Sequence, residues 1–236
     1  MAFVACIILA SFISNYIVQS YDFGEKVKTN SYTLYMISLA DSQLEKEAEM
    51  LCEDYQKIGA GGFVWKSEDY YHVISSAYLN KNDATLVQNS IKTNQNIESK
   101  LIEVKFNGIE IYQTLDANEN KVMTKAGNLF YNYYLSLFDI AISYDTFVYN
   151  EISARLAVNN LHSSLLETIA NFETVFKESL SSQEISPLYS SLLKAKEISE
   201  NLCGGEKLNS NQTYSSLLKY RYLQMLDLQK SLEQDM

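Results

Sequence analysis

The stretch DYYHVISSAYLNKNDA, residues 69–84, decides how the first half of this chain folds. Side chains alternate along a strand, so Tyr70, His72 and Ile74 are expected on one face and the residues between them on the other. Asn80 predicts the N-terminal cap of a following helix. The stretch therefore predicts a strand that leads into a capped helix and carries aromatic side chains on both of its faces.

Further strands and another helix are predicted on either side of this strand in the sequence. A helix after YTLYMISL is expected to begin with a capping box of Ser42 and Glu45 and to end at Gly59. The other predicted strands are YTLYMISL (32–39), FVWKS (63–67) and KLIEVKF (100–106). The order is β-α-β-β-α-β, the ferredoxin-like or split βαβ arrangement, in which two helices cover one face of a four-stranded sheet.

The second face of this sheet is the first candidate for a binding site. Sliding the chain by 39 residues places Leu34 on Val73, each in a strand that precedes a helix. If these two side chains face the helices, the opposite face is open and offers aromatic rings for stacking. The alternative is that the C-terminal half of the chain covers this face. The candidate site residues are Tyr35, Ile37, Trp65, Tyr70, His72 and Ile74.

Charge and motifs narrow the classes of ligand. The net charge is −10, and binding to nucleic acid depends on Lys and Arg. The chain also lacks the K/R-G-F-G-F pattern of RNA-recognition modules. We therefore expect no nucleic-acid partner, which leaves a small-molecule sensor or a carbohydrate-binding module.

Residues 32–106 resemble a SPOR domain, the peptidoglycan-binding module of many bacterial envelope proteins. The family's strands of the form Y-x-V-Q-x-G-x-F and y-R-V-x-v-G-P-F correspond here to YTLYMISL and YHVISSAY. Tyr71, Val73 and the aromatic residue Tyr78 fit the pattern. The family's Gln falls on Tyr35 and its Arg on His72, so this chain departs from the pattern at both positions.

The resemblance implies a function in the cell envelope. SPOR domains recognise glycan strands stripped of stem peptides at sites of septal wall remodelling, in cell division or sporulation. Family members are often attached outside the membrane by one N-terminal helix. The resemblance thus implies a peptidoglycan-binding protein that spans the cell membrane once and has most of its chain outside the cytoplasm.

The N-terminus carries a segment that suits this arrangement. AFVACIILASFISNYIV, residues 2–18, is uncharged and would extend about 25 Å as a helix, near the lower limit for crossing a bilayer. A buried core helix is the alternative. We predict a transmembrane anchor over 1–20 and a linker over 21–31.

The rest of the chain is predicted to be a bridge followed by a helical region. Residues 107–127 form a polar bridge, and 128–236 form an α-helical bundle that folds as a separate domain. Apolar residues from 128 to 186 recur at helical spacing, which indicates one very long helix or two helices that break near Asn159-Asn160. Ser186-Pro187 begins another helix and Gly204-Gly205 ends it. The predicted fold class is α+β.

The sequence gives little sign of catalysis. It contains no G-x-S-x-G, P-loop or dinucleotide loop, and its Cys and His residues lack metal-ligand spacing. We predict no enzyme, no metal and no cofactor, and reduced thiols at Cys6, Cys52 and Cys203. Two functions remain. One is the anchored wall-binding protein, whose helical region docks a protein partner. The other is a structural or partner-docking envelope protein whose sheet is buried by the helices and binds no glycan.

Overall fold

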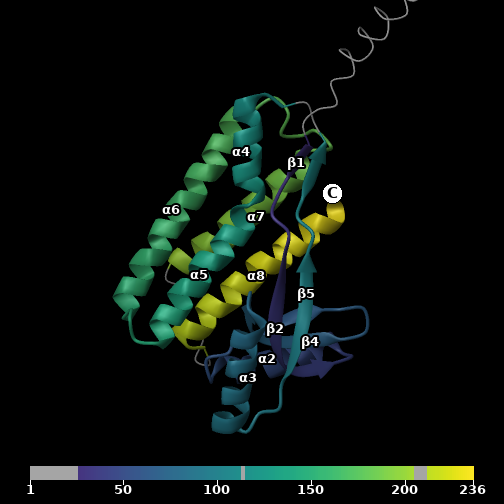
Figure 1. The fold of residues 1–236 in the computed structure, drawn as a ribbon. Helices are drawn as coiled ribbons and strands as arrows, with labels where there is room; N and C mark the ends of the chain where they lie inside the picture. The colour runs from purple at the N-terminus through teal and green to yellow at the C-terminus, as the bar shows by residue number, and fades with distance from the viewer. Residues whose placement is uncertain (1–25, 113–114, 205–211) are drawn as a thin grey trace, which may run out of the picture.

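The computed structural model describes residues 26–112, 115–204 and 212–236 of the chain. These residues form an α+β fold with a small antiparallel sheet and several long helices (Figure 1). The strands are β1 (Lys26–Lys28), β2 (Tyr32–Ser42), β3 (Phe63–Lys66), β4 (Tyr71–Tyr78), β5 (Lys100–Phe106) and β6 (Glu110–Tyr112). The helices are α2 (Glu45–Gln56), α3 (Lys81–Gln95), α4 (Ala117–Gly127), α5 (Leu129–Asp145), α6 (Glu151–Val175), α7 (Ser186–Cys203) and α8 (Tyr214–Asp235).

The β-α-β-β-α-β order predicted from the sequence is the order of β2, α2, β3, β4, α3 and β5. The four strands lie in the order β3-β4-β2-β5, and every neighbouring pair is antiparallel. Strand β4 ends at Tyr78, and the Asn80 side chain then accepts a hydrogen bond of 2.8 Å from the Asn82 amide to cap α3. The opening stretch therefore forms the predicted strand and the predicted capped helix.

Two irregularities interrupt the alternation of β2 and β4. In the register of this pair, Ser38 lies opposite Ile74 and Ala40 opposite Val73, so Leu39 and Ser75 have no cross-strand partner. Each extra residue reverses the faces of the side chains that follow it. Leu34 and Val73 consequently belong to opposite faces of the sheet, although the repeat in the sequence predicts that they share one.

Helices α2 and α3 cover one face of the sheet. Val73 packs there with Ala48 and Cys52 of α2, and Ile37 packs with Ala84 of α3. Burial removes apolar surface from water and stabilises this layer, at about 25 cal/mol per Å² of apolar surface.

Helices α5 and α8 pack against the opposite face, and the predicted open face is a mistaken expectation. Leu34, Met36, Phe63, Trp65 and Ile74 share one apolar cluster with the helical body. The Tyr134 hydroxyl of α5 donates a hydrogen bond of 3.1 Å to the Ala77 carbonyl of β4. These contacts join the sheet to the helices instead of leaving the face in solvent.

Helix α8 is hydrogen-bonded to the sheet and to its connecting loops at several points along the helix. Lys219 Nζ donates a hydrogen bond of 3.0 Å to the Gly59 carbonyl near the start of the helix. Tyr32 donates one of 2.6 Å to Gln229, and the Glu233 carboxylate accepts one of 3.1 Å from the Gly108 amide. Figure 1 shows α8, in yellow, running between the sheet and the other helices.

Two local expectations differ from the structure. The capping box of Ser42 and Glu45 does not form, because the Ser42 hydroxyl bonds to Glu47 and to the Leu44 amide. The predicted polar bridge contains β6, which pairs with β1, and α4. Asp116 and Glu119 cap α4 with a complete capping box.

The helical half also breaks at a different place. Residues 146–150 separate α5 from α6, whereas Asn159 and Asn160 lie inside α6. Helix α7 has its proline in the first turn and ends at Gly204, as the sequence predicts. The predicted division of the chain into a sheet domain and a separately folding bundle stays a prediction, although the two segments pack against each other.

Candidate functional site

The six residues predicted to bind glycan do not form one surface. Ile37 and Ile74 are completely buried, on opposite faces of the sheet. Trp65 and His72 are also buried, and Tyr35 packs partly against the α3 side. Tyr70 is the exception, because 42% of its surface remains exposed. The structure therefore places no stacking platform of these six side chains on the sheet.

Three of them do meet at one corner, where β3 turns into β4. Trp65 and His72 are cross-strand partners, and the Tyr70 and His72 rings lie 6.3 Å apart. Lys100 Nζ lies 5.9 Å from the centre of the Tyr70 ring. This corner, formed by Asp41, Ser67, Tyr70, His72 and Lys100, is called the polar corner below.

A chain of hydrogen bonds runs through the polar corner. His72 Nδ1 bonds to the Asp41 carboxylate, and His72 Nε2 lies 3.0 Å from Ser67 Oγ. Lys100 Nζ lies 2.5 Å from the other oxygen of Asp41. The composition resembles a Ser-His-Asp triad, in which histidine takes the proton of the serine hydroxyl.

The hydrogen bonds of Ser67 indicate that Ser67, His72 and Asp41 have a structural role. Ser67 Oγ donates a hydrogen bond of 3.0 Å to the Tyr70 carbonyl and accepts one of 3.3 Å from the Tyr70 amide. A serine hydroxyl has one proton, so His72 donates to Ser67 when that proton is given to Tyr70. The chain of bonds therefore holds the β3–β4 turn closed.

The sequence identified His72 but not its partners. Asp41 and His72 are 31 residues apart, and only the register of β2 on β4 makes them cross-strand neighbours. The signal that could have found Ser67 is its position five residues before His72, across a tight turn that opens with a serine.

The Asp41 carboxyl has a lowered pKa. Burial by itself would raise it, but hydrogen bonds from His72, Lys100 and Ser38 stabilise the charged form and hold the pKa below its ordinary value. A depressed pKa contributes stability that is complete above the unfolded-state value of about 3.9. That contribution is lost as the pH falls through the lower, folded-state value.

We therefore expect Asp41→Asn to lower the free energy of unfolding most near neutral pH. The difference from the wild type should shrink as the pH is lowered below about 4, where the wild-type carboxylate becomes protonated too. Urea titrations at a series of pH values measure this difference. Asp54→Asn is the control, because Asp54 forms an exposed ion pair with Lys57 on the surface. A difference that is independent of pH would contradict the expectation.

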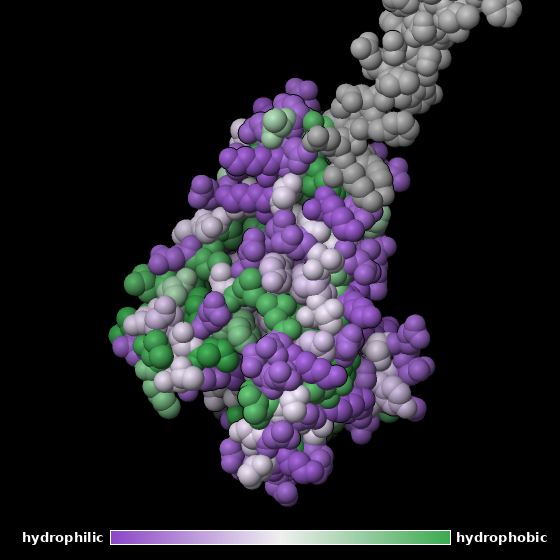
Figure 2. Space-filling model, in the orientation of Figure 1, coloured by the Kyte–Doolittle hydropathy of each residue, from purple (hydrophilic) through white to green (hydrophobic). Residues whose placement is uncertain are grey.

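A second feature is an exposed apolar surface where α5 turns into α6. Phe147 is 93% exposed, and four further apolar side chains at the end of α5, in the connection and in the first turns of α6 are exposed as well. This surface, called the α5–α6 tip below, consists of Ile142, Phe147, Val148, Ile152 and Leu156. Figure 2 shows hydrophobic residues gathered at the lower left, where Figure 1 places the α5–α6 connection. Large exposed apolar surfaces on proteins are frequently interaction sites.

The backbone of the α5–α6 tip is strained. Phe147 has a φ of 61°, in the left-handed region that costs a residue with a side chain about 1–2 kcal/mol. The neighbouring turn is fixed by a bond of 2.9 Å from the Tyr149 amide to the Ser143 carbonyl. This geometry keeps the Phe147 ring in solvent, where it contributes nothing to the core.

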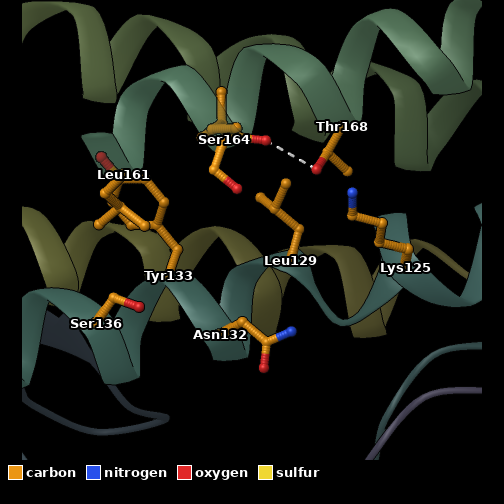
Figure 3. Close-up of a pocket in the computed structure, with 9 residues that line it drawn as sticks. Lys125, Leu129, Asn132, Tyr133, Ser136, Leu161, Ser164 and Thr168 are labelled. Atoms are coloured by element: carbon orange, nitrogen blue, oxygen red, sulfur yellow. Dashed lines mark hydrogen bonds between the residues drawn. The ribbon is translucent and has the colours of Figure 1, made fainter. Parts of the chain in front are cut away.

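A third feature is a cavity of about 160 Å³ in the helical body, between α4, α5 and α6 (Figure 3). Its walls combine leucines with hydroxyl, amide and ammonium groups. The lining residues are Lys125, Leu129, Asn132, Tyr133, Ser136, Leu161, Ser164, Leu165 and Thr168. None of them was singled out as a binding residue from the sequence, because helical spacing alone marks the leucines as core.

Metal sites and membrane spans are not found in the described ranges. Residues 26–112, 115–204 and 212–236 contain no cluster of three or more His, Cys, Asp or Glu side chains suited to a metal ion. None of the helices described is long and apolar enough to span a membrane. The predicted anchor at 2–18 and Cys6 lie outside the described residues. Cys52 and Cys203 are free thiols, and burial raises the pKa of Cys52 to about 12.

Comparison with known proteins finds no matching family model, no similar curated protein and no similar solved structure.

Proposed function

We propose that this protein is a non-enzymatic docking protein of the cell envelope, with the α5–α6 tip as its docking surface. Residues 2–18 attach it to the membrane in this proposal, and the sheet is part of the scaffold. The observation that carries the proposal is the tip itself, in which Phe147 is held in solvent by a strained backbone. A strained, exposed aromatic residue lowers stability and is typical of functional surfaces.

The position of the tip favours a protein partner over lipid. The described chain begins at β1, at the upper end of the molecule in Figure 1, and the α5–α6 connection lies at the lower left. A bilayer that held the chain near β1 would therefore lie at the end away from the tip. The charged residues beside the tip are paired, Glu151 with Arg155 at 2.7 Å and Asp145 with Lys219 at 2.7 Å. An apolar protein surface is thus the occupant that the tip suits best.

The burial of the sheet supports the same proposal. Helices α2 and α3 cover one face, and α5 and α8 pack against the other. Glycan stacking on the sheet would require the ring faces of Trp65 or Tyr35 to be free. This is the arrangement in which the helical region, and not a ligand, completes the sheet.

Photo-crosslinking from the α5–α6 tip is expected to give a specific covalent adduct with a protein partner. In the cells of origin, a photo-crosslinking residue at position 147 of the full chain should capture one protein partner. The control is the same photo-crosslinking residue at position 86 of α3. Leu86 is 68% exposed and lies outside the α5–α6 tip. Central interface residues contribute about 2 kcal/mol or more, so Ile152→Ser should reduce the 147 adduct by tenfold or more.

Two measurements complete this test. Phe147→Gly should abolish docking while leaving the free energy of unfolding unchanged or higher, because it removes the left-handed strain. An adduct of twice the chain mass would identify the partner as a second copy. The proposal fails if position 147 yields no more adduct than position 86.

One observation favours a second candidate, glycan binding at the polar corner. The Tyr70 ring is partly exposed there beside Lys100 and Asp41, which offers one stacking face and several hydrogen-bonding groups. Purified cell-wall sacculi that retained the wild type but released Tyr70→Ala would support it over the docking proposal.

A further inference from the structure

The cavity between α4, α5 and α6 has an apolar floor. Leu129, Tyr133 and Leu165 are almost completely buried, and Leu161 is partly buried beside them. At about 160 Å³ the cavity is smaller than typical sites for drug-sized ligands, which are roughly 300–1,000 Å³. Its size therefore suits a ligand whose apolar part has only a few carbon atoms.

The rim of the cavity is polar and open to solvent, because Lys125, Asn132 and Ser164 are exposed and Ser136 is partly buried. In the described part of the chain, the side chains of Lys125, Asn132, Ser136 and Ser164 make no hydrogen bond or ion pair with one another or with other residues. Thr168 differs, because its hydroxyl donates a bond of 2.9 Å to the Ser164 carbonyl. In Figure 3 the Ser164 hydroxyl and the Lys125 ammonium lie on either side of Leu129.

The types of group on this rim select a kind of ligand. An ammonium, an amide and two hydroxyls can all donate hydrogen bonds, and the ammonium adds a positive charge. Carboxylate oxygens accept such bonds, and bonds between charged groups are about twice as strong as neutral ones. A cation would be repelled by the Lys125 ammonium, and a fully apolar molecule would make no use of the rim groups, which would stay hydrated.

We propose that this cavity binds a small monocarboxylate with a short apolar chain. The carboxylate accepts hydrogen bonds from Lys125 and from Ser164 or Asn132 at the rim. The apolar chain of the ligand lies on Leu129, Leu161 and Leu165. This site is separate from the sheet and from the α5–α6 tip, so it does not depend on the proposed docking function.

Hexanoate is the probe, and the full chain is the protein used. Isothermal titration calorimetry should show saturable binding, and the methyl resonances of Leu129 and Leu165 should shift with the same dependence on concentration. Hexanol has the chain without the charge, and acetate has the charge with almost no chain. Each should bind at least about tenfold more weakly, because each loses one half of the contacts.

Two variants separate recognition from folding. Lys125→Met keeps the apolar stem and should weaken hexanoate binding by tenfold or more, while hexanol binding stays unchanged. Lys121→Met is the matched control, because Lys121 is exposed on the same helix outside the cavity lining. Ser164→Leu should fill the opening and abolish the methyl shifts, although Lys125 remains.

The proposal is overturned if the leucine methyls do not shift on saturation. It is also overturned if hexanol binds as tightly as hexanoate, or if Lys125→Met binds hexanoate with wild-type affinity. Binding that Lys121→Met weakens as much as Lys125→Met would show a non-specific effect of charge and would contradict the site.

Discussion

Replacing Tyr134 by alanine is expected to lower the free energy of unfolding by about 3–5 kcal/mol, the range for removing a buried aromatic side chain. Tyr134 is 1% exposed, and its ring lies 5.5 Å from Tyr222 and 5.9 Å from Phe138. Its hydroxyl also bonds to the Ala77 carbonyl of β4. The substitution removes packing and a hydrogen bond at the boundary between sheet and helices.

Two signals report the two sides of this boundary. Trp65 is the only tryptophan of the chain and lies in β3, so its fluorescence follows the sheet. Far-ultraviolet circular dichroism mainly follows the helices. In urea, Tyr134→Ala should move both transitions together to a lower urea concentration. The reason is that the sheet and the helices unfold as one cooperative unit.

Tyr134→Phe is the control for the hydroxyl alone. It keeps the ring and should cost about 1–2 kcal/mol, since the Ala77 carbonyl loses its side-chain partner. If Tyr134→Ala moved the dichroism transition and left the Trp65 transition in place, the sheet would fold independently. The sequence-based division into two domains would then be correct.

The second large effect is expected at Gly62, in the loop between α2 and β3. Gly62 has a φ of +59°, and an added Cβ would lie 2.6 Å from the Cys52 carbonyl oxygen and 2.6 Å from Gln56 Cγ. Gln56 Nε2 donates bonds of 3.2 Å to the Gly61 and Gly62 carbonyls, so it cannot easily move. Gly62→Ala should destabilise the protein by about 2–5 kcal/mol, from left-handed strain and steric overlap.

Gly59 provides a matched comparison in the same loop. Its φ is +87°, but an added Cβ would meet only Thr213 Oγ1, at 3.9 Å. Gly59→Ala should therefore show the conformational strain without the overlap, about 1–2 kcal/mol. Thermal or urea unfolding of the two variants measures both values. Equal losses for Gly59→Ala and Gly62→Ala would show that the overlap with α2 has no cost.

The order of strands and helices could be predicted because it depends on local signals. Alternation marked β2 and β4, and Asn80 marked the start of α3. Pro187 marked the first turn of α7 in the same way. These signals act within a few residues, so one sequence is enough to read them.

The faces of the sheet could not be predicted because they depend on distant residues. The unpaired Leu39 and Ser75 reverse the alternation of side chains between the two faces of the sheet. No local sequence pattern marks either residue as the site of such an irregularity. Both faces are buried, so apolar residues at odd and even positions give no preference between them. The partner of Ala77 is Tyr134, 57 residues later, which no local pattern indicates.

The candidate site was missed for a related reason. The α5–α6 tip resembles the apolar stripe of a helix in sequence, because Ile152 and Leu156 have the spacing of core residues. Only the placement of the turn at residues 146–150 shows that this stripe faces solvent. The cavity likewise requires the packing of α4, α5 and α6, which the sequence does not specify.

The position of α8 also determines when the protein can finish folding during its synthesis. The ribosome makes β2 almost 200 residues before Gln229, whose side chain accepts the Tyr32 hydroxyl bond. Until α8 emerges, the nascent sheet exposes Leu34, Met36 and Phe63, which it later buries. Exposed apolar strands of this kind aggregate or recruit chaperones. The last described helix therefore completes the burial of this face, and we expect a translation product truncated before α8 to expose part of an apolar sheet.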